Sequence, residues 1–249
     1  MNAFRRISLL LSLTLLAGAF GAKASAESFW AEHRVLSSKP PIRNACVMPA
    51  EAELDRFGVK STERLPKESD DWAVALTSLV NAHLKAVGVI PVSATNPLSS
   101  GASDSDIQQV IQQIQLKYDG MARSVDKKPK EISKGAYTLG DQVAMLPCAP
   151  NSDVIVIIRG AGSIPTVGRQ AMAGLAGGIM EQGALVTVTL VDAKSGEILA
   201  MTRFRNVADF VTNSEEGLGD PLDAGLADLN IGKARKLQAA REFSNPNQR

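Results

Sequence analysis

The chain has 249 residues, of which 45% are hydrophobic and 4% aromatic, and its 27 basic and 26 acidic side chains give a formal net charge of +1 at pH 7. This length and apolar content suit one large domain, or one domain with extensions. The balanced, interspersed charge excludes the concentrated basic surface that neutralises phosphates, so we expect no nucleic-acid partner.

The amino terminus has the three parts of a cleavable secretory signal. A basic start at residues 5–6 is followed by an apolar run over 7–20 and by the small residues 24–26 of a cleavage site. The apolar run is shorter than the roughly 20 residues that a membrane-spanning helix needs. We therefore expect removal of residues 1–26 by cleavage near Ala26, and a bacterial periplasmic or secreted protein with no transmembrane span. Peripheral membrane contact is compatible with this expectation.

Cys46 and Cys148 are the only cysteines of the chain. An even number of cysteines in an exported protein favours a disulfide, because the thiol-reducing systems stay in the cytoplasm. Two buried free thiols are the alternative. Neither cysteine belongs to a C-x-x-C pair, so redox chemistry is not expected.

The first part of the exported chain predicts little regular structure before residue 44. Residues 27–42 show no sustained hydrophobic period and are interpreted as an extended leader. The short apolar segment 44–48 is typical of a strand that ends at Pro49. Residues 51–67 are polar and rich in turn formers, which favours a loop.

Two helices with an edge strand between them are predicted next. The first helix covers 71–87, where apolar residues recur at helical spacing after the capping oxygens of Ser69 and Asp70. Residues 89–92 contain a proline and therefore suit an edge strand. A capping box opens the second helix, which is predicted to cover 103–125.

The second half of the chain carries the clearest strand signals. Residues 153–159 form an uninterrupted apolar run rich in β-branched residues, the pattern of a central strand that is covered on both faces. Two further strands, 185–191 and 197–205, are predicted to form a hairpin that turns at Asp192 to Gly196.

These elements predict an α/β fold with a mixed sheet, flanking helices in a three-layer-like arrangement and a β-hairpin in the carboxy-terminal half. The α/β domain is expected to span 43–210. Residues 211–249 follow as a helical extension with a frayed tail.

A glycine-rich segment directly after the central strand is a candidate binding loop. Gly160 and Gly162 are predicted to turn the chain, but Pro165 stands where a dinucleotide fingerprint needs a third glycine. One interpretation is a plain strand-to-helix turn. The alternative is a loop for a small ligand, an anion or a carbohydrate, held by Arg159 and Arg169.

Catalytic and metal-binding patterns are not found in the sequence. The chain has two histidines: His83 falls on the apolar stripe of its helix, and His33 lies in the leader. No G-x-S-x-G motif occurs, and the cysteines and histidines have no close ligand spacing. We therefore predict no enzyme activity, no catalytic residues, no metal and no cofactor.

The small-residue segment 172–180 is a candidate contact surface. Gly174 and Gly178 form a G-x-x-x-G pattern that lets a second helix approach closely. We interpret Met172, Gly174 and Gly178 as a partner or oligomer contact. The alternative is a glycine-weakened segment that packs on its own sheet.

The order of strand, helix, strand, helix, buried strand and hairpin resembles one group of envelope proteins: the curli-secretion lipoprotein (CsgG type), the amino-terminal domain of TolB, and related lipoproteins. Residues 44–49 are similar to their opening strand, and 152–162 to the strand before their variable insertion. The hairpin around 192–199 is also similar, and the resemblance covers roughly 43–205. It implies a non-enzymatic periplasmic domain that scaffolds or supports an envelope or secretion assembly. The implied partners are envelope proteins or further copies of the chain.

Overall fold

The structure is a computed structural model that describes residues 26–31, 42–95, 103–175 and 183–206. Several predictions lie outside the described residues: the signal, most of the leader, Gly178 and the carboxy-terminal extension.

One mixed sheet contains the eight strands of the described chain. The strands are β1 (Ala26–Ala31), β2 (Asn44–Val47), β3 (Glu51–Phe57), β4 (Thr62–Arg64), β5 (Ile90–Ser93), β6 (Val154–Pro165), β7 (Gly183–Asp192) and β8 (Ile198–Asn206). Their order is β1-β8-β7-β6-β2-β5, and β3 follows β2 along the same edge of β6, with β4 outside it. β2 runs parallel to β5 and β6, β3 runs parallel to β6, and the remaining pairs are antiparallel.

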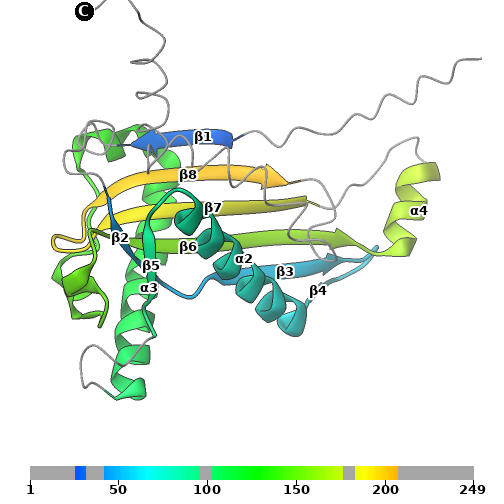
Figure 1. The fold of residues 1–249 in the computed structure, drawn as a ribbon. Coiled ribbons are helices and arrows are strands. Elements are labelled where there is room, and N and C mark those ends of the chain that lie inside the picture. Colours follow the sequence, from blue (N-terminus) through cyan, green and yellow to red (C-terminus); the bar gives the residue numbers. More distant parts are fainter. Residues whose placement is uncertain (1–25, 32–41, 96–102, 176–182, 207–249) are drawn as a thin grey trace, which may run out of the picture.

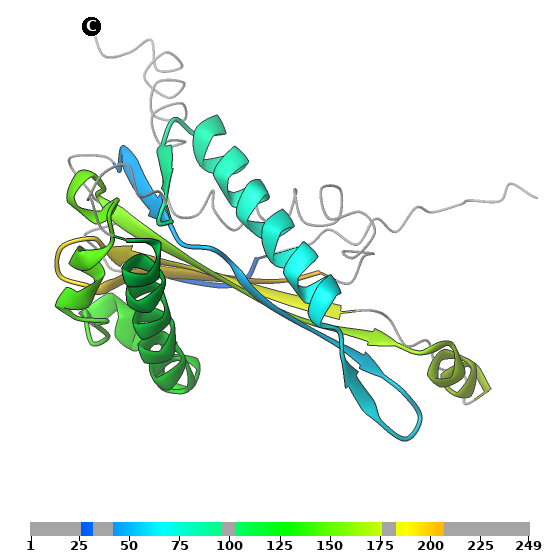
Figure 2. The same cartoon turned by 90° about the horizontal axis from the view of Figure 1, so that it is seen from below.

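Two long helices cover opposite faces of the sheet, which gives the predicted α/β class with three layers. These are α2 (Pro66–Ala86) and α3 (Asp104–Lys127). Figure 2 shows α2 above the sheet and α3 below one end of it. The helices of the described chain further comprise α4 (Val167–Leu175) and the 3₁₀ helices η2 (Pro129–Lys134), η3 (Asp141–Met145) and η4 (Ala149–Asn151).

β6 is the central strand, as its apolar run predicted. Val154, Val156 and Ile158 pack against α2, whereas Ile155 and Ile157 belong to the core under α3. Alternate residues of a strand point to opposite faces, so a strand covered on both sides needs apolar residues throughout.

The two ends of the sheet differ. The 3₁₀ helices and α3 gather at one end, whereas the β3–β4 hairpin, the end of β6 and α4 extend away at the other (Figures 1 and 2). Among the described residues, no helix combines the length and apolar character needed to cross a bilayer.

The prediction of a loop over 51–67 is wrong. The segment forms β3 and β4, and α2 already begins at Pro66. The polar pattern arises because Leu54 is the only fully buried residue of β3. Ser69 does not cap α2 but joins it to β3: its hydroxyl donates to Leu65 O (2.6 Å) and accepts from Leu54 N (2.9 Å).

Other predicted elements are found close to their expected bounds. β2, β7 and β8 match their segments, and β5 lies at an edge of the sheet. The capping box of α3 is confirmed, with Ser103 Oγ accepting from Asp106 N. The predicted leader contributes one strand, since β1 pairs antiparallel with β8.

Candidate functional site

Arg159 is the centre of a charged cluster on the face of the sheet that carries α3. It pairs in register with Glu51 of β3 and Thr187 of β7, so these three side chains share that face. Its guanidinium forms ion pairs with Glu51 and with Asp119 of α3, the latter at 2.9 Å. It also lies 5.5 Å from the centroid of the Tyr118 ring, an attractive cation–π geometry.

The carboxylates of Glu51 and Asp119 compensate the positive charge of Arg159. The side chain is only 18% exposed, and burial lowers its pKa to about 10, so it is still a cation at neutral pH. Burial also raises the pKa of Asp119, and the neighbouring Glu53 adds to this. A free anion would have to displace one of two carboxylates, so the cluster suits attachment of α3 to the sheet better than anion capture.

A cleft of about 500 Å³ opens beside this cluster. On its β3–β4 side, Arg64 contacts Glu53 at 2.6 Å and Asp55 at 3.4 Å. The hydrogen bond from Arg64 is the main reason that the pKa of Glu53 is lowered. The two arginines of the cleft are thus paired with carboxylates, Arg159 with Glu51 and Asp119, and Arg64 with Glu53.

Two further contacts join α3 to the sheet. The Tyr118 hydroxyl and Thr189 Oγ1 are 2.7 Å apart, and burial raises the pKa of Tyr118 to about 12. One heptad further along α3 from Asp119, Asp126 forms an ion pair with Arg203 of β8. Residues seven apart lie on one face of a helix. The contacts of Tyr118, Asp119 and Asp126 therefore attach one face of α3 to the sheet.

The predicted turn at Gly160 and Gly162 is wrong, because both residues continue β6 as far as Pro165. A Cβ atom at Gly160 would lie 2.7 Å from the Trp72 ring of α2. Glycine is therefore required by the close approach of a helix, not by a turn.

The predicted ligand loop from Gly160 to Arg169 is also wrong. Between Arg159 and Pro165 the chain is extended, so these two residues are about 20 Å apart. Arg169 instead donates to Gly58 O (3.1 Å) at the far end of β3. The structure does not bring the two arginines together.

The segment around Met172 forms α4 at the open end of the sheet, and none of the nine residues of this helix is buried. Val167 and Leu175 are 82% and 86% exposed, and Met172 is also exposed. A Cβ added at Gly174 would meet no other atom within 4 Å. The G-x-x-x-G contact itself includes Gly178, which lies outside the described residues.

Two exposed apolar residues of the β3–β4 hairpin lie beside α4. Phe57 O accepts a hydrogen bond from Thr166 N (2.8 Å), and Val59 Cγ2 lies 3.9 Å from the position of a Cβ added at Gly168. We call the exposed apolar residues of this end the tip surface: Phe57, Val59, Val167, Met172 and Leu175. Sequence reasoning missed the hairpin part, although large apolar residues in a polar hairpin were a signal.

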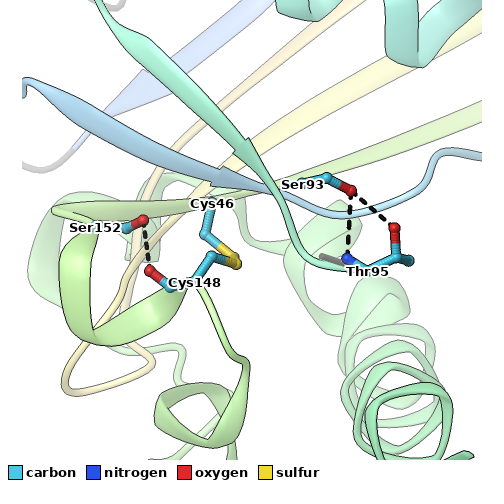
Figure 3. The surroundings of a disulfide bond; sticks show 5 residues. All are labelled: Cys46, Ser93, Thr95, Cys148 and Ser152. Atoms are coloured by element: carbon cyan, nitrogen blue, oxygen red, sulfur yellow. Dashed lines mark hydrogen bonds between the residues drawn. A yellow bond between two sulfur atoms is a disulfide. The ribbon is translucent and has the colours of Figure 1, made fainter. Parts of the chain in front are cut away.

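Cys46 and Cys148 form the predicted disulfide, with a Cα–Cα distance of 5.4 Å (Figure 3). The bond ties β2 to the segment that leads into β6, and the Ser152 hydroxyl donates to Cys148 O (2.8 Å).

The predicted hairpin turn is also present. Asp192 Oδ1 accepts hydrogen bonds from Lys194 N and Ser195 N, and Gly196 has a φ of 71°. A Cβ at Gly196 would overlap Gly140 O, so this position requires glycine for two reasons. In the described ranges, no group of three or more histidine, cysteine or acidic residues has a geometry suited to a metal ion.

Comparison with known proteins gives few similarities. No protein-family model matches the chain, and no curated protein matches it. Two solved PelC dodecamers from Paraburkholderia phytofirmans, one of them a point variant, are similar at 12% and 10% identity with TM-scores of 0.30 and 0.31. Each match covers 73% of this chain, and 87% and 85% of the PelC chains.

Proposed function

We propose that this chain is a non-enzymatic, exported periplasmic protein that scaffolds or supports an envelope or secretion assembly through protein contacts. The tip surface is the observation that carries the proposal. The resemblance of the element order to the curli-secretion lipoprotein and TolB group remains a hypothesis within it.

The tip surface has features of a contact site rather than of a chain connection. A two-residue turn suffices to join antiparallel neighbours such as β6 and β7, yet residues 166–182 connect them. The described part of this connection is a helix that buries none of its residues and exposes three large apolar ones. Apolar side chains that gather at one end of a molecule are typical of interaction sites.

The partner we propose is an envelope protein that offers an apolar surface with an acidic rim. The apolar part would cover Val167, Met172 and Leu175. The acidic rim would complement Lys60, which is exposed next to Val59.

A photo-crosslinking experiment in intact cells tests this proposal. A photoreactive phenylalanine derivative replaces Leu175, and Leu116 on α3, which is 72% exposed, serves as the matched control position. We expect a defined cross-linked species from position 175 and none from position 116. Val167→Asp should abolish this species without changing the melting temperature, because Val167 is exposed.

Three results would contradict the proposal: no cross-link at position 175, equal cross-linking at both positions, or a cross-link only between copies of the chain. Mass spectrometry of the purified protein tests export separately. An amino terminus at Glu27 is expected, and an uncleaved chain would contradict periplasmic release.

A further inference from the structure

The chain path around β2 creates a switch point of the kind where α/β proteins bind ligands. β5, β2 and β6 are parallel neighbours. After β2 and the β3–β4 hairpin the chain enters α2 on one face, whereas after β5 it enters α3 on the other face. Where connections from adjacent parallel strands diverge in this way, a crevice forms at the carboxyl ends of the strands.

A pocket of about 290 Å³ lies at this place. Its walls come from the end of β2, the end of β5 and one side of α2: Val47, Pro49, Ser93, Thr95, Ser78 and Asn81. It shares only Ala50 and Ala73 with the cleft beside Arg159. It is also separate from the tip surface, with which it has no residue in common.

A hydrogen bond joins α2 to the segment between β2 and β3. Thr77 Oγ1 accepts from Ala50 N (3.0 Å) and donates to Ala73 O (2.9 Å), which fixes the helix to the chain between β2 and β3. On the opposite wall, the hydroxyls of Ser93 and Thr95 are 2.8 Å apart (Figure 3). Both walls therefore carry oriented polar groups.

The chemistry of the walls selects for an uncharged ligand. None of the lining residues is ionisable, so an ionic ligand would lose hydration without a compensating charge. Val47, Pro49 and Val74 supply apolar surface, whereas Ser78 and Asn81, one turn apart on α2, supply a hydroxyl and a carboxamide. The volume lies at the lower end of the roughly 300–1,000 Å³ that is usual for small-molecule sites, which suits a ligand of one ring.

We propose that this switch-point pocket binds one ring of a neutral sugar. A pyranose presents an apolar C–H face and a rim of hydroxyls, which matches apolar walls with hydroxyl and amide groups at their edges. The proposal extends beyond the contact function of the tip surface, because neither site needs the other.

Titration of the exported chain with glucose, galactose, mannose and N-acetylglucosamine, followed by amide NMR, tests the proposal. We expect saturable shifts for at least one of these sugars, concentrated at Ala50, Ser93 and Thr95. Ser78→Trp fills the pocket, and Asn81→Leu removes the amide at similar volume. Each should weaken binding about tenfold or more, Ser78→Trp because the indole occupies the space of the sugar and Asn81→Leu because one or two hydrogen bonds are lost.

Ala82→Trp is the matched control, because it adds the same side chain at an exposed position of α2 that does not line the pocket. It should leave the affinity within about twofold of the wild type, a change of less than about 0.5 kcal/mol. The proposal is overturned if none of the four sugars gives a saturable shift. It is also overturned if Ser78→Trp binds as the wild type does, or if Ala82→Trp weakens binding equally.

Discussion

Gly160 shows how one missing side chain decides where a helix lies. A Cβ at this position would stand 2.7 Å from Trp72 Cζ3 and 2.9 Å from Leu76 Cδ1. Both partners are buried in the core under α2, so neither has room to withdraw. The close approach of α2 to β6 therefore depends on glycine at residue 160.

Gly160→Ala should lower the free energy of unfolding by about 1–3 kcal/mol, the usual cost of overpacking a core. Chemical denaturation measures the loss. Gly174→Ala is the control, since nothing lies within 4 Å of a Cβ there, and alanine favours a helix. Equal stability of Gly160→Ala and wild type would contradict the packing argument.

Tyr118 makes stability depend on pH at the alkaline end. Burial raises the pKa of its phenol to about 12, above the ordinary value near 10. The neutral phenol is thus favoured in the folded state. Its contribution to stability is complete below about pH 10 and is lost as the pH rises through about 12.

Tyr118→Phe isolates this effect, because Arg159 and the other groups that titrate in the same range are present in both proteins. Between about pH 10 and pH 12 the wild type should lose about 2 kcal/mol more than the variant, because each pKa unit corresponds to 1.36 kcal/mol and one of the two states is half-titrated at each end of this range. Unfolding free energies measured across this range test the prediction. Parallel pH curves for the two proteins would contradict it.

At the scale of elements, α3 is attached by polar contacts as well as by its apolar stripe. Arg203 is 22% exposed and pairs with Asp126. Asp126→Asn removes the negative charge and leaves a largely buried guanidinium without its counter-ion, so we expect a loss of about 1–3 kcal/mol in unfolding free energy.

Glu131→Gln provides the comparison for Asp126→Asn. It breaks the pair with Lys134, whose side chain is 67% exposed, and solvent screens such exposed pairs so strongly that they add little to stability. Denaturation curves of both variants, measured under the same conditions, compare their losses in unfolding free energy. Equal effects would mean that the Arg203 pair is no more than a surface contact.

Which elements the sequence predicts depends on how each one is buried. β6 is covered on both faces, so its sequence is one uninterrupted apolar run. The first residues of α3 form a capping box, which marks the start of the helix in the sequence. β3 buries only Leu54 completely, and β1 is the last strand on its side of the described sheet, where β8 is its one neighbour among the described strands. The sequence of neither strand therefore shows a clear alternation of apolar and polar residues.

The sites are harder to predict than the strands, because they arise from distant contacts. Gly160 resembles a turn residue until Trp72 is placed beside it. The pocket at Ser78 and Ser93 exists because two connections leave the sheet on opposite faces. A single sequence contains the residues of such sites but does not show that they lie close together in the fold.

At the scale of the whole molecule, one covalent link encloses a large part of the fold. The disulfide joins residues 102 positions apart, and the enclosed chain contains α2, β5 and α3. Both cysteines are buried, with 0% and 2% exposure. Both also lie in the core under α3, so on that face of the sheet the bond ties β2 to the segment before β6.

Opening this link should destabilise the whole molecule rather than one element. Chain entropy assigns a loop of this length about 4–5 kcal/mol, because the bond restricts the unfolded chain. The variant with both Cys46→Ala and Cys148→Ala should lose several kcal/mol in unfolding free energy, as should the wild type unfolded in the presence of a reductant. The reductant should leave the double variant unchanged. A wild type whose stability does not respond to reduction would show that the fold holds α2 and α3 in place without the bond.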